Sequence, residues 1–146
     1  MKRALLAFVV CASILGLAPA VEADIDPSRP AASLARENAF ALGGVGYAGT
    51  MSGGEKDLRA ILKQPDAVQQ LQSLLQNASP AGQLYALLGL RLRDRPAYEQ
   101  AVPAFRNRSD VISTMHGCIL TKEKMEAIVK QIEHGDYDTS LNRAPW

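Results

Sequence analysis

The chain contains no apolar run long enough to cross a bilayer as a helix. Its longest apolar stretch, residues 4–20, falls short of the about 20 residues that a spanning helix needs. Ser13, Gly16 and Pro19 also interrupt this stretch. The sequence therefore predicts no transmembrane anchor in the mature protein.

The same stretch has the pattern of a secretory signal peptide. Lys2 and Arg3 precede the apolar run, and small residues follow it at the positions that signal peptidase requires. Residues 1–23 are therefore predicted to be removed, by cleavage after Ala23 or alternatively after Ala20. We expect an exported protein, periplasmic or extracellular.

Cysteine and histidine are scarce, with two of each. Cys11 lies within the predicted signal peptide, so Cys118 is the only thiol expected in the mature chain and an internal disulfide is excluded. His116 and His134 are the only imidazoles. Too few ligands remain for a Cys-rich metal site, and we expect neither a metal nor a cofactor.

A surplus of charge is also missing, because 16 basic residues face 15 acidic ones. Removal of Lys2, Arg3 and Glu22 with the signal peptide leaves the two signs in equal number. A nucleic-acid-binding protein usually carries an excess of positive charge. Nucleic acid is therefore not an expected partner.

Helix signals recur along the rest of the chain. Ser52 and Glu55 have the spacing of a capping box, and Ser79 begins a helix that is apolar almost all round. On that helix, Gly82 and Gly89 share one face, where another helix can approach closely. Further helices are expected from Ser33 to Leu42, from Pro65 to Ala78, from Pro96 to Phe105 with a kink at Pro103, and from Thr121 to Gly135.

These signals predict an all-α fold, a single compact domain of about five or six short helices. The expected organisation is a flexible leader over residues 24–32, a helical domain over 33–135 and a polar, mobile tail over 136–146. Residues 107–120 match no period, and we expect part helix and part buried loop there.

The proline-marked helix pairs between Gly53 and Arg106 loosely resemble the hairpins of HEAT-type repeats. The resemblance is carried by helix length and proline placement. It implies a helical scaffold that binds a partner along one face.

Residues 44–49 match the glycine fingerprint of dinucleotide-binding folds. The fingerprint requires a strand before it and a helix directly after it. The preceding segment is Ala-rich and expected to be helical, so we interpret these residues as a glycine loop without a nucleotide.

Cys118 follows His116 after a single glycine, which makes a thiol beside an imidazole the one candidate catalytic pair. The apolar neighbours Ile119 and Leu120 favour instead a buried structural cysteine. An intermolecular disulfide is a further alternative, because an odd cysteine in an exported protein can pair between chains.

One local excess of charge is a candidate binding patch. Asp94 and Glu99 are the only acidic residues that oppose it within residues 91–108. The patch consists of Arg91, Arg93, Arg95, Arg106 and Arg108.

The leading hypothesis is an exported, non-enzymatic helical protein that binds another exported or envelope protein as an inhibitor, immunity-type protector or adaptor. It is motivated by good helices and by the lack of an assembled catalytic motif. A small thiol-dependent enzyme or redox protein using Cys118 and His116 is one alternative. A carrier of an apolar ligand is the other.

Overall fold

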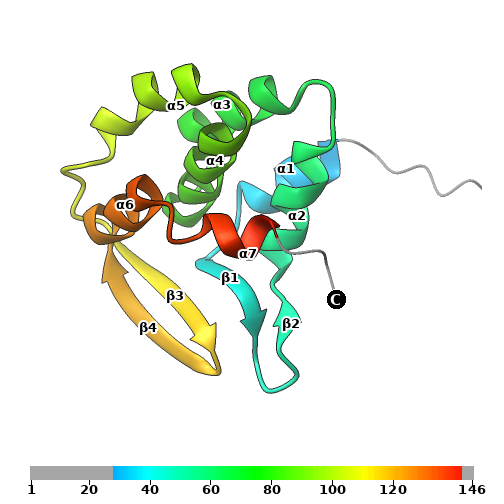
Figure 1. Cartoon of the computed structure of the whole chain (residues 1–146), viewed down its shortest axis with the longest axis vertical. Helices are drawn as coiled ribbons and strands as arrows, with labels where there is room; N and C mark the ends of the chain where they lie inside the picture. Colours follow the sequence, from blue (N-terminus) through cyan, green and yellow to red (C-terminus); the bar gives the residue numbers. More distant parts are fainter. Residues whose placement is uncertain (1–27, 143–146) are drawn as a thin grey trace, which may run out of the picture.

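The computed structural model describes residues 28–142, which form a mixed α/β fold (Figure 1). The expectation of an all-α domain is wrong, because a four-stranded sheet accompanies seven α-helices over these residues. The predicted signal peptide, residues 1–23, lies outside the described residues. The elements are α1 (Ser28–Leu34), β1 (Ala39–Val45), β2 (Thr50–Met51), α2 (Gly53–Leu62), α3 (Ala67–Asn77), α4 (Pro80–Arg93), α5 (Arg95–Ala101), a 3-10 turn (Val102–Ala104), β3 (Val111–Gly117), β4 (Ile119–Lys124), α6 (Met125–His134) and α7 (Asp138–Asn142).

α4 forms the centre of the fold. Its first turn is capped by Ser79, whose hydroxyl accepts a hydrogen bond from the Gly82 amide at 3.1 Å. All side chains from Leu84 to Leu90 are buried. Four helices contact α4, namely α2, α3, α5 and α6. The apolar side chains that lie almost all round α4 are therefore covered on several sides.

Two glycines of α4 allow this close packing, as predicted. A Cβ on Gly82 would lie 2.4 Å from the carbonyl oxygen of Leu34 at the end of α1. A Cβ on Gly89 would lie 2.7 Å from a methyl of Leu71 and 2.9 Å from one of Leu58. A side chain at Gly82 would meet the backbone of α1, which would have to move, whereas one at Gly89 would require the two leucine side chains to repack.

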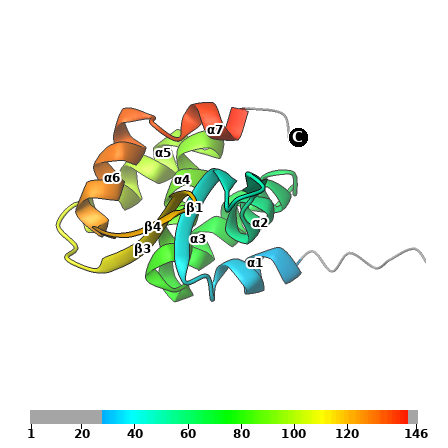
Figure 2. The same ribbon diagram turned by 90° about the horizontal axis from the view of Figure 1, so that it is seen from below.

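The sheet has the strand order β2-β1-β3-β4, with β1 and β3 parallel and the two outer pairs antiparallel. Phe40 of β1 is buried, and its ring centroid lies 4.8 Å from that of Tyr85 on α4. Ile112 and Thr114 of β3 are buried as well. Seen from below, α6 and α7 follow one side of the strands and α1 lies on the other (Figure 2).

Two segments differ from expectation because strands replace helix and loop. The helix expected from Ser33 to Leu42 is divided between the end of α1 and β1, and residues 107–120 contain β3 and its turn. Residues 28–32, expected in the leader, open α1. β1 and β3 are distant in sequence, so their pairing is a tertiary effect that overrides the helix propensity of an Ala-rich segment.

The HEAT-like arrangement is also wrong, although its helices are present. α2 to α5 occupy the region as predicted, and the 3-10 turn at Pro103 accounts for the expected kink. These helices surround α4 and share one hydrophobic core with the sheet. In a solenoid, each repeat contacts only its neighbours. Here α2, α3 and α5 all contact α4, so the helices do not stack as repeated pairs.

Residues 136–142 form more regular structure than predicted. α6 begins at Met125 and not at Thr121, which belongs to β4, and it ends as expected at Gly135 with φ of 86°. The expected mobile tail instead contains α7. Tyr137 is buried and packs edge-on against Phe40 at 5.2 Å, so aromatic burial fastens this segment to the sheet.

Candidate functional site

The predicted thiol–imidazole pair lies at the tip of a hairpin. His116 pairs with Ile119, so Gly117 and Cys118 are the two residues of the turn between β3 and β4. Gly117 has φ of 57° and Cys118 has negative φ, the pattern of a type II′ turn. Both His116 and Cys118 are exposed. The interpretation of Cys118 as a buried structural cysteine is therefore wrong.

The geometry does not activate the thiol. Among residues 28–142, no hydrogen bond joins the Cys118 thiol to the His116 imidazole. His116 belongs to the strand and Cys118 to the turn. A thiol that relies on an adjacent general base needs that base within hydrogen-bond reach, so these two residues are not arranged as such a pair here. The thiol-dependent alternative stays a prediction.

The glycines of the apparent dinucleotide fingerprint shape a second hairpin, between β1 and β2. Gly46 and Gly49 have φ of 70° and 61°, and a Cβ on Gly44 would lie 2.8 Å from the Gly49 carbonyl oxygen. The loop returns the chain antiparallel to β1, whereas the fingerprint leads from a strand directly into a helix. Residues 46–49 thus form a loop as interpreted, although a strand and not the expected helix precedes it.

The tips of the two hairpins meet at one end of the molecule (Figure 1). The Gly46 amide donates a hydrogen bond of 2.8 Å to the Gly117 carbonyl oxygen. Tyr47 beside it is fully exposed, and Ile119 and Leu120 are 67% and 62% exposed. We call this region the tip surface; it consists of Tyr47, His116, Cys118, Ile119 and Leu120.

β4 continues from the tip surface as an edge strand. It pairs with β3 on one side and with no described strand on the other. Side chains alternate between the two faces of a strand. One face of the β3–β4 hairpin, the outer hairpin face, therefore carries Val111, Ser113, Met115, Leu120, Lys122 and Lys124.

Charges on this hairpin are divided between its faces. On the face opposite to the lysines, Glu123 accepts hydrogen bonds from the Thr114 hydroxyl at 2.7 Å and from the Gln131 amide at 3.4 Å. Lys122 and Lys124 are exposed and make no ion pair within residues 28–142. The outer hairpin face is therefore apolar and basic.

The predicted arginine patch offers little free charge. Arg93 is exposed, but Arg91 pairs with Asp138 at 3.1 Å and also donates to the Ile132 carbonyl oxygen. The other ion pairs are Arg95–Glu99, Arg106–Glu133 and Arg108–Asp110. The hydrogen bond from Arg108 holds the pKa of the Asp110 carboxyl below its usual value.

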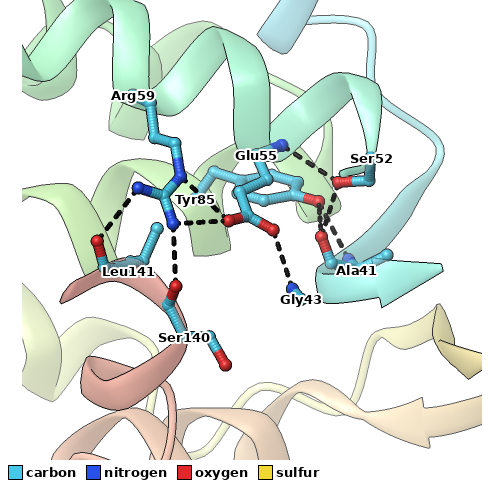
Figure 3. A network of polar contacts seen from close by, with 8 residues as sticks. All are labelled: Ala41, Gly43, Ser52, Glu55, Arg59, Tyr85, Ser140 and Leu141. Atoms are coloured by element: carbon cyan, nitrogen blue, oxygen red, sulfur yellow. Dashed lines mark hydrogen bonds and ion pairs between the residues drawn. The ribbon is translucent and has the colours of Figure 1, made fainter. Parts of the chain in front are cut away.

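A buried polar network joins α2, β1 and α7 (Figure 3). The Glu55 carboxylate accepts from the Gly43 amide at 2.7 Å and from the Arg59 guanidinium at 2.8 Å and 2.9 Å. Arg59 also donates to the carbonyl oxygens of Ser140 at 2.7 Å and Leu141 at 3.0 Å. The capping signal marked Glu55 in the sequence, and its i,i+4 spacing could have marked Arg59. The contacts with Gly43 and with α7 leave no local pattern.

The hydroxyl groups of this network are engaged with backbone. Tyr85 donates to the Ala41 carbonyl oxygen and accepts from the Ala41 amide, both at 2.8 Å, and burial raises the pKa of Tyr85 to about 12. Ser52 donates to the same carbonyl at 2.7 Å. Because no base receives the Ser52 proton, this hydroxyl is not activated as a nucleophile, and the network stabilises the fold.

A groove of about 400 Å³ lies between α1 and α3. Half of its lining residues are polar, but most of the surface that lines it is apolar, so the carrier of an apolar ligand stays a prediction. The lining consists of Ala31, Ala32, Ala35, Asp66, Gln70, Ser73, Leu74 and Asn77.

Residues 28–142 contain neither a metal-ligand cluster nor a membrane-spanning helix. No three His, Cys, Asp or Glu side chains of this segment are grouped so that they could hold a metal ion. None of its helices has both the length and the apolar character that crossing a membrane requires.

No family model matches this chain, and no match is found among curated proteins or solved structures. Its own geometry defines a mixed α/β protein with two joined hairpin tips and an open edge strand.

Proposed function

We propose that this is an exported, non-enzymatic protein that binds another protein through the tip surface, as an inhibitor, protector or adaptor. The observation that carries the proposal is the exposure of three large apolar side chains, Tyr47, Ile119 and Leu120, each more than 60% exposed, on two hairpins whose tips are joined by a backbone hydrogen bond. Ile119 and Leu120 are successive residues of β4 and point to opposite faces of the hairpin, so apolar surface is offered on both.

Single exposed apolar residues are common on soluble proteins and need no explanation. Here two adjacent residues of one hairpin are exposed, and a fully exposed tyrosine lies on the hairpin bonded to it. Tyrosine is among the residue types that supply most of the free energy of protein–protein binding. Ile119 and Leu120 lie on a strand that is paired with β3, which reduces the conformational entropy that they lose on binding.

Capture from the exported fraction of the source cells tests this proposal. The mature wild-type protein and an Ile119→Asp/Leu120→Asp variant would each be immobilised, and the retained proteins identified by mass spectrometry. We expect a partner that the wild type retains stoichiometrically and the variant loses. Both side chains are exposed, so the variant should fold normally, which circular dichroism verifies.

The matched control is Leu92→Asp on α4, since Leu92 is an exposed large apolar residue outside the tip surface. It should retain the partner. Equal retention by the tip variant and the wild type, or no stoichiometric partner at all, would contradict the proposed function.

A further inference from the structure

The open edge of β4 offers unpaired backbone groups. In an antiparallel pair, successive residues alternately face the partner strand and point away from it. His116 and Ile119 close the two-residue turn, and the Gly117 carbonyl oxygen points to β1. The backbone amide and carbonyl groups of Ile119, Thr121 and Glu123 therefore face β3. The amide and carbonyl groups of Leu120 and Lys122 therefore point to the free edge.

The same two residues place their side chains on the outer hairpin face. From the tip toward α6 this face presents Leu120, then Lys122, then Lys124 at alternate positions of β4. Cross-strand neighbours interact directly, and opposite charges stabilise the pair whereas like charges destabilise it. An added strand would thus meet one apolar side chain and two positive charges.

These charges argue against a second copy of this chain as the added strand. A symmetric antiparallel β4–β4 pair centred on Lys122 would place that lysine opposite its own copy. Centring on Thr121 would place Leu120 opposite Lys122 and gather four lysines on one face. Lysines on an edge strand are a common device against such self-pairing.

We infer that β4 receives an extended acidic segment of another protein, which adds to the sheet as a fifth strand. The inference rests on the proposed function and deepens it, because it names the binding mode and the partner chemistry. In the antiparallel orientation the segment carries acidic residues opposite Lys124 and Lys122 and an apolar residue opposite Leu120. Its sequence pattern is acidic–x–acidic–x–apolar, and backbone hydrogen bonds supply the attachment.

Synthetic peptides test the inference directly. The acidic probe contains Glu-Thr-Glu-Thr-Leu between Gly-Ser flanks, and the basic probe replaces both glutamates with lysine. Each would be titrated into the isotope-labelled protein while amide NMR shifts are followed. We expect saturable shifts from the acidic probe at residues 119–124, and binding of the basic probe about tenfold weaker or more.

Charge reversal provides the sharper arm. Lys122→Glu/Lys124→Glu should exchange the preference, so that the basic probe binds more tightly than the acidic one. The control Lys56→Glu/Lys63→Glu changes the net charge by the same amount at two exposed positions, one within α2 and one at its end. It should bind each probe with the affinity of the wild type, within about twofold.

A third probe has its alternate backbone amides methylated and should lose binding, because strand addition requires those donors. Equal binding of both probes, shifts outside β4, or binding that survives methylation would overturn the inference. So would a preference for anionic lipid vesicles over the acidic probe.

The two proposals fail separately. If the capture experiment depends on Ile119 and Leu120 but charge reversal at the two lysines changes nothing, the tip surface binds a partner by another mode. If capture does not depend on the tip surface, the proposed function itself is wrong.

Discussion

Glu55 connects three segments that are far apart in sequence. It lies in the first turn of α2, receives the Gly43 amide of β1, and pairs with Arg59, which in turn holds the last carbonyl groups of α7. A buried carboxylate is stable only when it is paired and hydrogen-bonded. The consequence is that one side chain couples the glycine hairpin to the end of the chain.

Glu55→Gln should therefore lower the free energy of unfolding by about 3 kcal/mol, because it leaves the charge of Arg59 without its carboxylate partner in a buried site. Urea denaturation measures the loss. The control is Glu99→Gln, which removes the exposed Arg95–Glu99 pair of the same helical spacing and should cost less than about 1 kcal/mol. Equal losses would show that the Glu55 network contributes no special stability.

Gly82→Ala should destabilise the protein by about 2 kcal/mol or more, since the new Cβ would meet backbone of α1 that cannot rotate away. Gly53→Ala is the matched change at the start of α2, where the new Cβ would have no packing neighbour within 4 Å. Its free energy of unfolding should stay within about 0.5 kcal/mol of the wild-type value. Thermal unfolding of both variants checks this. A neutral Gly82→Ala would contradict the close approach of α1 to α4.

At the scale of elements, the helices were predictable because their signals are local. Ser79, Pro80 and Gly135 mark helix ends through caps and backbone preferences that act within one turn. β1 was not predictable in this way, since its partner β3 lies far along the chain and its residues Ala39 to Leu42 resemble a continuing helix.

The β3–β4 hairpin left a signal that could have been recognised. Two runs rich in β-branched residues, from Val111 and from Ile119, are separated by Gly117 and Cys118, and a glycine at the first position of a two-residue loop favours a type II′ turn. The tip of this hairpin, with His116, Cys118, Ile119 and Leu120, follows from that turn. Its contact with the glycine hairpin does not, because the Gly46–Gly117 bond is a tertiary feature.

The docked position of α7 gives an element-scale prediction. Tyr137→Ala should cost about 3 kcal/mol, because it removes a buried aromatic side chain from the contact with Phe40. Thr139→Ala changes an exposed residue of the same segment and should be nearly neutral. Chemical denaturation distinguishes them. A neutral Tyr137→Ala would restore the expectation of a mobile tail.

At the scale of the whole molecule, buried tyrosines should make stability depend on alkaline pH. Burial raises the pKa of Tyr85 to about 12 and also raises the pKa of Tyr137 and of Tyr98. Below about pH 10 these hydroxyls are neutral in both states, so they cause no dependence. As pH rises from about 10 to 12, the unfolded chain releases its protons first, and folding is disfavoured.

The free energy of unfolding should thus fall by up to about 1.4 kcal/mol per pH unit for each such tyrosine over that range. Urea midpoints measured at several alkaline pH values test this. Tyr85→Phe, which has no proton to release there, should flatten the fall. A constant free energy of unfolding between about pH 10 and 12 would contradict the burial of these hydroxyls.

The position of Cys118 predicts an accessible thiol in the native protein. A thiol reagent should modify folded protein about as fast as protein unfolded in urea, within about tenfold, because the turn leaves the sulfur open to solvent. Protection by several orders of magnitude would indicate the buried cysteine that the apolar neighbours first suggested.

The central claim is that the joined hairpins, and β4 above all, are where this protein meets its partner. Hydrogen exchange of the protein, free and bound to the captured partner, tests it most directly. We expect the amides of Leu120 and Lys122 to exchange rapidly in the free protein and slowly in the complex. Unchanged exchange in β4, with new protection confined to the groove between α1 and α3, would contradict it.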